Sequence, residues 1–267
     1  MCAFVIVDPV SCGSQHSRGW RLLEPKLAKI YPYMSLAFPR RRSEMAALVS
    51  AALREGHTEI VAVGGGMLEE AVNGFFDAEG SLSPDAVLAF LASGDGIATL
   101  SKAAVRPIDV GRASFLSREG KPRTRYFATM AAFGQIAGFV DAKKRPLLAK
   151  LGAGLLGYRG RPVRLIVDQS FDEIVTIRSV AIGNGQAFGK VRGARVGAEP
   201  NDGQFDIVIT AQSPIGNALR EVRGHKILAA PVEQTRGRPV AVALDFQTVG
   251  RLPATFEILP RALNVRC

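Results

Sequence analysis

The sequence is poor in cysteine, in acidic residues relative to basic ones, and in long apolar runs. The cysteines at positions 2, 12 and 267 lack the paired spacing of a disulfide scaffold or a zinc site. No stretch approaches the roughly 18 consecutive apolar residues of a transmembrane helix. The first residues lack the basic region of a secretory signal. We therefore expect a globular protein of the cytoplasm.

The composition of the 267 residues is that of a folded protein with one large domain or two small ones. Hydrophobic residues make up 47% of the chain and charged residues 22%, which is enough apolar material for a core. The anomaly is charge, because 34 Lys and Arg face 24 Asp and Glu and give a net charge of +10. A positive field attracts anionic partners such as nucleic acid, nucleotide phosphates or an anionic bilayer.

Much of the positive charge lies between Arg118 and Arg164, where eleven basic residues face two acidic ones. The run from Lys143 to Leu151 places cations on both sides of an apolar stretch, which predicts peripheral association with an anionic membrane. In the competing interpretation, the leucines pack in the protein core and the charges keep it soluble. No helix-turn-helix, RNP or zinc-finger pattern accompanies the charge, so we expect no nucleic-acid partner.

The first 110 residues alternate strand and helix signals. Apolar runs at 4–7, 60–63 and 87–91 have the length of strands buried on both faces of a parallel sheet. Apolar residues at helical spacing predict helices over 19–30 and 43–55, the second with Ser43 as its N-cap and Gly56 just past its end. This alternation predicts an open α/β sheet.

The later part of the chain predicts an antiparallel β-rich domain, because short β-rich runs are separated by Gly, Pro, Asn and Asp. These runs are 162–168, 174–182, 205–209, 239–246 and 254–259. The stretch 126–159 is rich in Ala and Gly, and we expect it to be partly helical.

Each apolar run of the first part passes directly into a turn of small residues, beginning at Asp8, Gly64 and Ser93. Glycines let backbone amides approach a phosphate closely, and a following helix adds the partial positive charge of its N-terminus. Ligands of open α/β sheets bind beyond the carboxyl ends of the strands. The three turns therefore predict phosphate binding, and the alternative is tight strand-to-helix packing without a ligand.

These turns resemble the motifs of the diacylglycerol kinase catalytic family, which includes bacterial lipid kinases and sphingosine kinases. The family's NPxSG pattern corresponds to DPVSCG at 8–13, its GGDGTLNEVVNG pattern to VGGGMLEEAVNG at 63–74, and its GTxND turn to ASGDGIAT at 92–99. Later motifs of the family are similar to IDVG at 108–111, IGNG at 182–185, NDGQFD at 201–206 and FEILPRALNV at 256–265. The resemblance covers nearly the whole chain in the family's order.

The resemblance implies an N-terminal open α/β nucleotide-binding domain and a C-terminal antiparallel β-rich domain that binds the lipid, with the active-site cleft between them. We place the first at 1–115, with 253–267 packing back on it, and the second at 116–252. It also implies transfer of the ATP γ-phosphoryl group to a lipid hydroxyl with Mg²⁺. A homodimer is left open.

The resemblance also carries roles over to individual residues. Asp202 would orient or deprotonate the lipid hydroxyl, with Asp206 as the second acidic candidate, and Asp95 would bind the metal. The residues expected to bind the nucleotide are Asp8, Ser11, Gly64, Gly65, Gly66, Gly94, Asp95, Gly96 and Asp245. Each acidic candidate has a simpler interpretation, since Asn-Asp-Gly favours a hairpin turn and Asp95 could cap the following helix. Arg40 to Arg42 could clamp a phosphate or be exposed charges.

The sequence departs from the family at several polar positions. Gly65 and Met67 stand where the GGDGT pattern has Asp and Thr, Asp95 and Ile97 replace Thr and Asn of the next turn, and the late DGE element reads DFQ from Asp245. Loss of a carboxylate from phosphoryl-transfer machinery costs several orders of magnitude in rate. We therefore expect a lipid kinase-like protein with reduced activity.

Two alternatives stay open. One is a catalytically inactive relative that binds nucleotide or lipid without phosphoryl transfer. The other is an NAD-kinase-like enzyme, since that family also has a GGDGT motif. The closing motif and the NG element favour the lipid kinases over it. Both kinase interpretations expect an aspartate where Gly65 stands.

Overall fold

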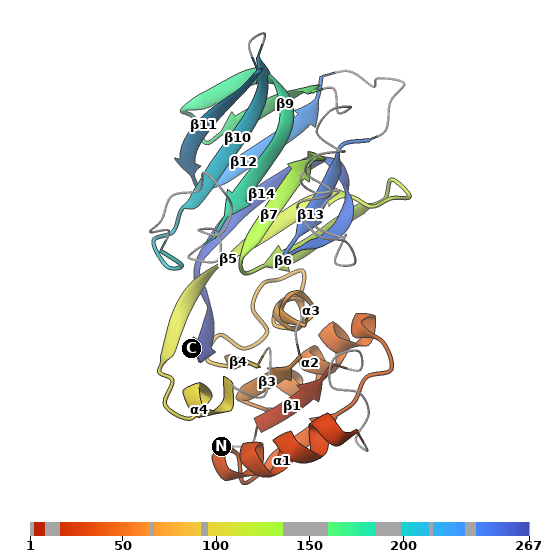
Figure 1. The fold of residues 1–267 in the computed structure, drawn as a ribbon, viewed down its shortest axis with the longest axis vertical. Coiled ribbons are helices and arrows are strands. Elements are labelled where there is room, and N and C mark those ends of the chain that lie inside the picture. Colours follow the sequence, from red (N-terminus) through yellow and green to blue (C-terminus); the bar gives the residue numbers. More distant parts are fainter. Residues whose placement is uncertain are drawn as a thin grey trace. The chain divides into compact units, whose positions relative to one another are not determined.

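The computed structural model describes residues 3–8, 17–64, 67–91, 96–135, 160–184, 199–213, 216–232 and 239–266. The chain divides into two compact units (Figure 1). Unit 1 consists of Met1–Ile108 and Arg261–Cys267, and unit 2 is Asp109–Pro260. The described residues are mostly strand, with few helices.

Unit 1 contains a parallel sheet in the order β4-β3-β1-β2, and the end of β14 (Gln247–Arg266) adds a parallel strand beside β4. Its strands are β1 (Ala3–Val7), β2 (Met34–Ala37), β3 (Glu59–Val63) and β4 (Val87–Leu91). Its helices are α1 (Arg18–Ile30), α2 (Met45–Arg54), α3 (Leu68–Asn73), α4 (Ile97–Leu100) and the 3-10 turn η1 (Arg42–Glu44).

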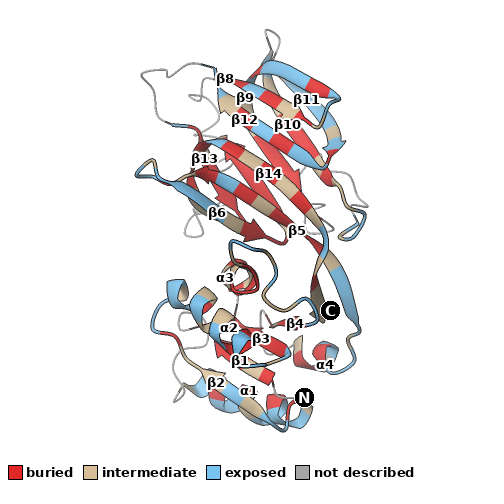
Figure 2. Ribbon diagram, turned by 180° about the vertical axis from the view of Figure 1, so that it is seen from behind, coloured by how far each residue is buried: buried red, intermediate tan, exposed pale blue. Residues whose placement is uncertain are grey.

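The sheet of unit 1 forms where the sequence has continuous apolar runs. All five residues of β3 are buried, as expected for a strand covered on both faces (Figure 2). Helix α1 begins after Ser17, whose side chain accepts a hydrogen bond from the Trp20 amide, and its buried face packs Trp20, Leu23 and Leu27 against the sheet. The predicted parallel strands and α1 are therefore confirmed.

One predicted helix cap in unit 1 is wrong. Ser43 lies inside the 3-10 turn η1, and the N-cap of α2 is Glu44. The backbone tightens into one 3-10 turn before the α-helix starts, which moves the cap by one residue. At the other end, Gly56 has a φ of +91°, which confirms it as the left-handed residue just past α2.

Unit 2 is built from antiparallel pairs (Figure 1). Strands β7, β13, β14, β12, β8 and β9 pair in a closed circuit, because β9 pairs with both β7 and β8. Strands β10 and β11 extend from β9, and β5 and β6 extend from β14. The bounds are β5 (Val105–Leu116), β6 (Pro122–Phe127), β7 (Met130–Gly134), β8 (Arg161–Val167), β9 (Phe171–Gly183), β10 (Phe205–Ser213), β11 (Gly216–Gly224), β12 (Lys226–Pro231) and β13 (Ala241–Leu244).

Aromatic side chains fill the core of unit 2. The rings of Phe127 and Phe205 stack with centroids 5.7 Å apart, and those of Phe133 and Phe256 stack at 5.9 Å. Gly111 lies against the Phe127 ring so closely that a Cβ atom would be 2.1 Å from the ring. A glycine is therefore required where β5 crosses this ring.

Of the stretch 126–159, which we expected to be partly helical, residues 126–127 and 130–134 belong to β6 and β7. Residues 136–159 lie outside the described residues, so a helix there stays a prediction. Strands β11 and β12 were not predicted. Strand β11 is polar and mostly exposed and so lacks an apolar run, whereas the apolar residues 227–230 of β12 were a signal that the prediction missed. Within the described part of the chain, no helix is long and apolar enough to cross a membrane.

Candidate functional site

The carboxyl ends of three neighbouring strands lie level with one another in unit 1. Val7 pairs with Val63, and Val63 pairs with Leu91, so β1, β3 and β4 end at one edge of the sheet. The backbone hydrogen bonds continue one residue further, from the Asp8 amide to the Val63 carbonyl at 2.8 Å and from the Gly64 amide to the Leu91 carbonyl at 2.7 Å. This brings together the starts of the three small-residue turns, at the edge where α/β sheets bind ligands.

Asp8 is fully buried at this edge and forms an ion pair with Arg42. The guanidinium donates from Nε to Asp8 Oδ1 at 3.0 Å and from Nη2 to Oδ2 at 2.6 Å. Hydrogen bonding to Asp8 raises the pKa of Arg42, although partial burial opposes the shift. Of the three arginines proposed as a phosphate clamp, Arg42 is thus held by a carboxylate, while Arg40 and Arg41 are exposed.

Met67 is fully buried, directly before α3. It therefore presents no hydroxyl where the family pattern has threonine, and it serves the core instead. Gly96 is the N-cap of α4, which corrects the alternative that Asp95 caps this helix. Ser11, Gly65, Gly66, Gly94 and Asp95 lie outside the described residues, and their roles stay predictions.

In unit 2, Arg223 of β11 binds both acidic candidates. Its Nη2 donates to Asp202 Oδ2, and its Nε donates to Asp206 Oδ1 at 3.0 Å. Hydrogen bonding to Asp202 raises the pKa of Arg223, although partial burial opposes the shift. Asp202 also accepts a hydrogen bond from the Gln204 amide at 3.0 Å, the geometry of an Asx turn. The segment is therefore a turn, as expected, but not a tight hairpin, since β9 ends at Gly183 and β10 begins at Phe205. A chemical role for Asp202 stays a prediction.

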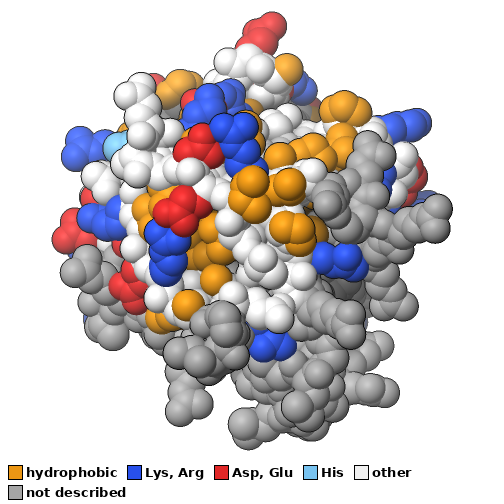
Figure 3. Space-filling model, turned by 90° about the horizontal axis from the view of Figure 1, so that it is seen from above, with side chains coloured by type: hydrophobic (Ala, Val, Ile, Leu, Met, Phe, Trp, Pro, Cys, Tyr) orange, Lys and Arg blue, Asp and Glu red, His pale blue; other side chains and the backbone are white. Residues whose placement is uncertain are grey.

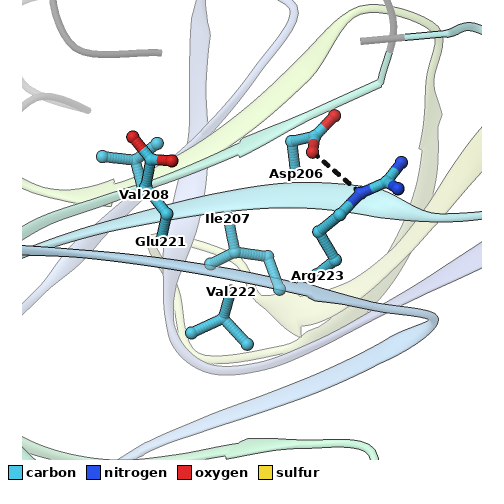
Figure 4. A pocket seen from close by; sticks show the side chains of 6 residues that line it. All are labelled: Asp206, Ile207, Val208, Glu221, Val222 and Arg223. Carbon is cyan, nitrogen blue, oxygen red and sulfur yellow. Dashed lines mark hydrogen bonds and ion pairs between the residues drawn. The ribbon is translucent and has the colours of Figure 1, made fainter. Parts of the chain in front are cut away.

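A hollow of about 250 Å³ follows the β10–β11 ladder beside this ion pair. Figure 4 shows Asp206 and Arg223 joined across the two strands, with Val208 and Glu221 further along the ladder. Val208 also contributes to a small buried cluster with Met130, Ala132 and Ala181. The hollow therefore has a charged end and an apolar wall.

A hydrogen-bonded network around Asp109 was not predicted from the sequence. Asp109 is fully buried, its amide donates to the Pro200 carbonyl at 2.7 Å, and its Oδ2 accepts from the Gly203 amide at 2.7 Å. Asp109 thus anchors both ends of the turn that carries Asp202. The signal available was a lone Asp between apolar residues, in the motif IDVG.

Asn184 joins this network from the end of β9. Its Nδ2 donates to the Asp109 carbonyl at 2.6 Å and to the Ala128 carbonyl at 3.1 Å, and the whole residue is 3% exposed. Its amide donates to the Thr129 carbonyl at 2.9 Å. The network therefore connects β5, the β6–β7 turn and the end of β9.

Asp245 occupies the turn between β13 and β14 with Phe246, at φ values of 38° and 71°. Its carboxylate accepts hydrogen bonds from the amides of Ala128, Thr129 and Met130 at 2.8–3.0 Å and from the Thr129 hydroxyl at 2.5 Å. Burial raises the pKa of the Asp245 carboxyl, and these hydrogen bonds oppose the shift. In this structure the carboxylate holds the β6–β7 turn, and its predicted nucleotide contact stays a prediction.

The resemblance implies Mg²⁺, so we asked whether the chain offers ligands for it. Among the described residues, no group of three or more His, Cys, Asp and Glu side chains is arranged to hold a metal ion. The carboxylate oxygens of Asp202 and Asp206 are paired with Arg223, and Asp202 also accepts a hydrogen bond from a backbone amide. These residues do not fit a magnesium site, and we derive no step through the metal.

Two protein-family models match the chain. The diacylglycerol kinase catalytic domain matches residues 2–113, and the YegS C-terminal NAD kinase beta sandwich-like domain matches residues 142–267. Their order along the chain follows the order of the two units. The chain therefore belongs to the diacylglycerol kinase-like family, as its motifs predicted.

Solved structures share the fold. A Bacillus anthracis str. Sterne protein assigned as a diacylglycerol kinase aligns with a TM-score of 0.75 at 17% identity, covering 99% of this chain and 96% of that one. The crystal structure of a diacylglycerol kinase from the same organism aligns with a TM-score of 0.68 at 16% identity over the same shares. At this identity the likeness shows the fold alone. A search of curated proteins finds no significant match.

Proposed function

We propose that the protein is a lipid kinase of low activity that transfers a phosphoryl group from ATP to the hydroxyl of a diacylglycerol or a sphingoid base. One observation carries the proposal: β1, β3 and β4 end level, so their small-residue turns start at one edge of the unit 1 sheet. Backbone amides at such an edge are suited to bind phosphates. Membership of the diacylglycerol kinase-like family supports ATP and a lipid as the two substrates.

The proposal gives each unit a task. The turns of unit 1 hold the nucleotide, and Asp95, which lies outside the described residues, stays the sequence's candidate for a metal ligand. In unit 2, Asp202 orients the acceptor hydroxyl and Asp206 shares its arginine partner. An active-site cleft between the two domains stays a prediction. We place the protein in the cytoplasm.

A second candidate is a relative that binds nucleotide or lipid without transferring a phosphoryl group. The buried Met67 favours it, because a methionine in the core cannot contact a phosphate. Gly65 adds to this, since a glycine offers no carboxylate at the position where the kinases have one. The two candidates differ in turnover and share nucleotide binding.

A variant with an aspartate at position 65 distinguishes the two candidate functions. We expect the wild type to bind ATP in the presence of Mg²⁺ by calorimetry but to phosphorylate dioctanoylglycerol very slowly, because loss of such a group costs orders of magnitude in rate. Gly65→Asp is expected to raise turnover at least about tenfold, equal to roughly 1.4 kcal/mol of transition-state stabilisation. Ser35→Asp, at an exposed position of β2, adds the same charge to unit 1 and should change neither quantity.

Three results would overturn parts of this proposal. No ATP binding by the wild type removes nucleotide from the function. ATP binding without any turnover in the wild type and in Gly65→Asp leaves the non-catalytic candidate. Fast wild-type turnover that Asp95→Ala abolishes would show that Asp95 has replaced the lost carboxylate.

We also propose that the protein associates with anionic membranes through the segment Arg118–Arg164. Residues 136–159 of this segment lie outside the described residues. Of the described basic residues, Lys121, Arg123 and Arg164 are exposed, and Arg164 pairs with Asp172 at 2.7 Å. Figure 3, seen from above, shows blue and red side chains next to one another with hydrophobic ones between them. Basic charge on that face is thus partly balanced by acids.

Vesicle sedimentation tests this association. We expect binding to anionic but not to neutral vesicles, weakened by salt, because each basic residue near an anionic surface contributes about 1 kcal/mol. Replacing Lys143, Lys144 and Arg145 by alanine should abolish most of it. The matched control removes three exposed cations of α1, Arg21, Lys26 and Lys29, and should leave binding unchanged. Equal losses in both variants would show a response to net charge alone.

A further inference from the structure

The hollow beside the β10–β11 ladder is large enough to hold a ligand group. Its volume is about 250 Å³, whereas a water molecule takes up about 30 Å³ in the liquid. Figure 4 shows four lining side chains on one side of the ladder, in alternation with Ile207 and Val222 on the other. The four are Asp206, Val208, Glu221 and Arg223. These side chains therefore determine what the hollow can bind.

The charged groups of the hollow do not cancel. Arg223 donates to Asp206 from Nε at 3.0 Å and to Asp202 from Nη2, so two carboxylates already share its single positive charge. Glu221 adds a further carboxylate. It is exposed, and among the described residues it forms no ion pair. The hollow is therefore negative where the whole chain carries a net charge of +10, and its charge favours a cationic ligand.

Glu221 and Asp206 lie diagonally across the ladder. Asp206 pairs with Arg223, and Glu221, two residues before Arg223, pairs with Val208. Residues at such diagonal positions lie about 7–8 Å apart, which long side chains can span. Two polar groups on neighbouring carbon atoms of a ligand can therefore each contact one of the two carboxylates.

The wall of the hollow between the two acids is apolar. Val208 lies opposite Glu221 and belongs to the small buried cluster with Met130, Ala132 and Ala181. A ligand that lies along this wall gains from removing apolar surface from water. The hollow is thus suited to an ammonium group carried on an apolar body, rather than to a bare inorganic cation.

We propose that Glu221 binds the ammonium group of an amino alcohol lipid whose neighbouring hydroxyl lies at the Asp206 end of the hollow. The inference rests on the proposed function, and it selects a sphingoid base over a diacylglycerol as the acceptor. An ammonium group donates charge-assisted hydrogen bonds to a carboxylate, whereas the ester groups of a diacylglycerol have no donor and no charge. Glu221 thus determines specificity and takes no part in the transfer of the phosphoryl group.

The test compares two soluble alcohols of equal chain length, 2-amino-1-octanol and 1,2-octanediol, which differ in one group. Calorimetry without nucleotide measures both affinities. We expect the wild type to bind the amino alcohol about tenfold more tightly at low salt, since a hydrogen bond to a charged group is stronger than a neutral one. Added salt should reduce this preference. Glu221→Gln, which keeps the shape of the side chain, should bind both alcohols equally. The control Glu55→Gln removes an exposed charge of unit 1 and should keep the preference.

Four results would overturn the inference: equal affinity of the wild type for the two alcohols, binding of neither, a preference that persists in Glu221→Gln, and equal losses in Glu221→Gln and Glu55→Gln. The third would assign the ammonium group to another acid, and the fourth would show an effect of net charge alone. The lipid kinase proposal is judged separately, by ATP binding and by turnover of dioctanoylglycerol. Turnover of dioctanoylglycerol without a preference for the amino alcohol would leave that proposal standing while this inference fails.

Discussion

Replacing Asp245 with alanine lowers the free energy of unfolding by an expected 3–5 kcal/mol, on the order of three buried amides losing their acceptor. In the wild type, Asp245 is 9% exposed as a residue, and its carboxylate accepts four hydrogen bonds from the turn at 128–130. Alanine also fits poorly at a φ of 38°, in the left-handed region that aspartate and asparagine tolerate better. Urea denaturation, with the midpoint and the slope both measured, checks the prediction.

Two further variants isolate the cause of this loss. Asp245→Asn keeps the residue's tolerance for positive φ but turns one acceptor into a donor, so its loss should lie between those of the wild type and alanine. Asp168→Ala is the matched control, since Asp168 also has a positive φ and accepts from the amides of His225 and Lys226. Partial burial opposes ionisation of Asp168, but these hydrogen bonds hold its pKa below the ordinary value.

Because the Asp168 side chain is 29% exposed, water can replace it as an acceptor, and its loss should be the smaller. Equal losses at the two aspartates would show that backbone strain, rather than buried donors, determines the cost. A loss of less than about 1 kcal/mol in Asp245→Ala would contradict the role assigned to its carboxylate.

Arg266→Ala is expected to destabilise the protein by about 3–5 kcal/mol, because it leaves a buried carboxylate without its cation. Arg266 lies at the end of β14 and donates to Glu59 from Nε at 2.7 Å and from Nη2 at 2.9 Å. Glu59 is 2% exposed and also accepts from the Tyr31 hydroxyl at 2.5 Å. Burial and the contact with Glu59 raise the pKa of Tyr31 far above its ordinary value. Thermal and urea unfolding both report the loss.

A double variant shows whether charge or packing is responsible. Glu59→Gln combined with Arg266→Met removes both charges and keeps similar volumes, so it should recover more than half of the stability lost in Arg266→Ala. The control Arg54→Ala breaks an exposed pair with Asp77, at 3.6 Å, and should cost no more than about 1 kcal/mol. If the double variant is no more stable than Arg266→Ala, packing of β14 on β4 matters more than the ion pair.

Most strands of unit 1 could be predicted from the sequence, because a parallel strand buried on both faces appears as an uninterrupted apolar run. The runs at 4–7, 60–63 and 87–91 correspond to β1, β3 and β4, and the small-residue turns that follow them start at one edge. Unit 2 was harder to predict. The polar edge strand β11 carries no such run, and an antiparallel strand with one exposed face gives a weaker pattern.

The candidate site divides in the same way. Its motifs identified the family and named Asp202 and Asp206, since motif spacing is a local property of the chain. The hydrogen-bond partners of the other buried acids near the two candidate sites are far away in the sequence. Arg42 reaches Asp8 across 34 positions, and Gly203 reaches Asp109 across 94.

The sequence by itself thus determined the order of strands, turns and motifs, and with it the family. Only the tertiary structure decided which charged side chains form ion pairs and which polar atoms find a hydrogen-bond partner. Asp245 was assigned to the nucleotide by its motif, and its carboxylate is engaged by amides about 116 positions away. Such partners depend on strand register and on the packing of distant elements. Each strand's own residues set its propensity and its buried face, whereas the hydrogen bonds between distant turns form only when the sheets close.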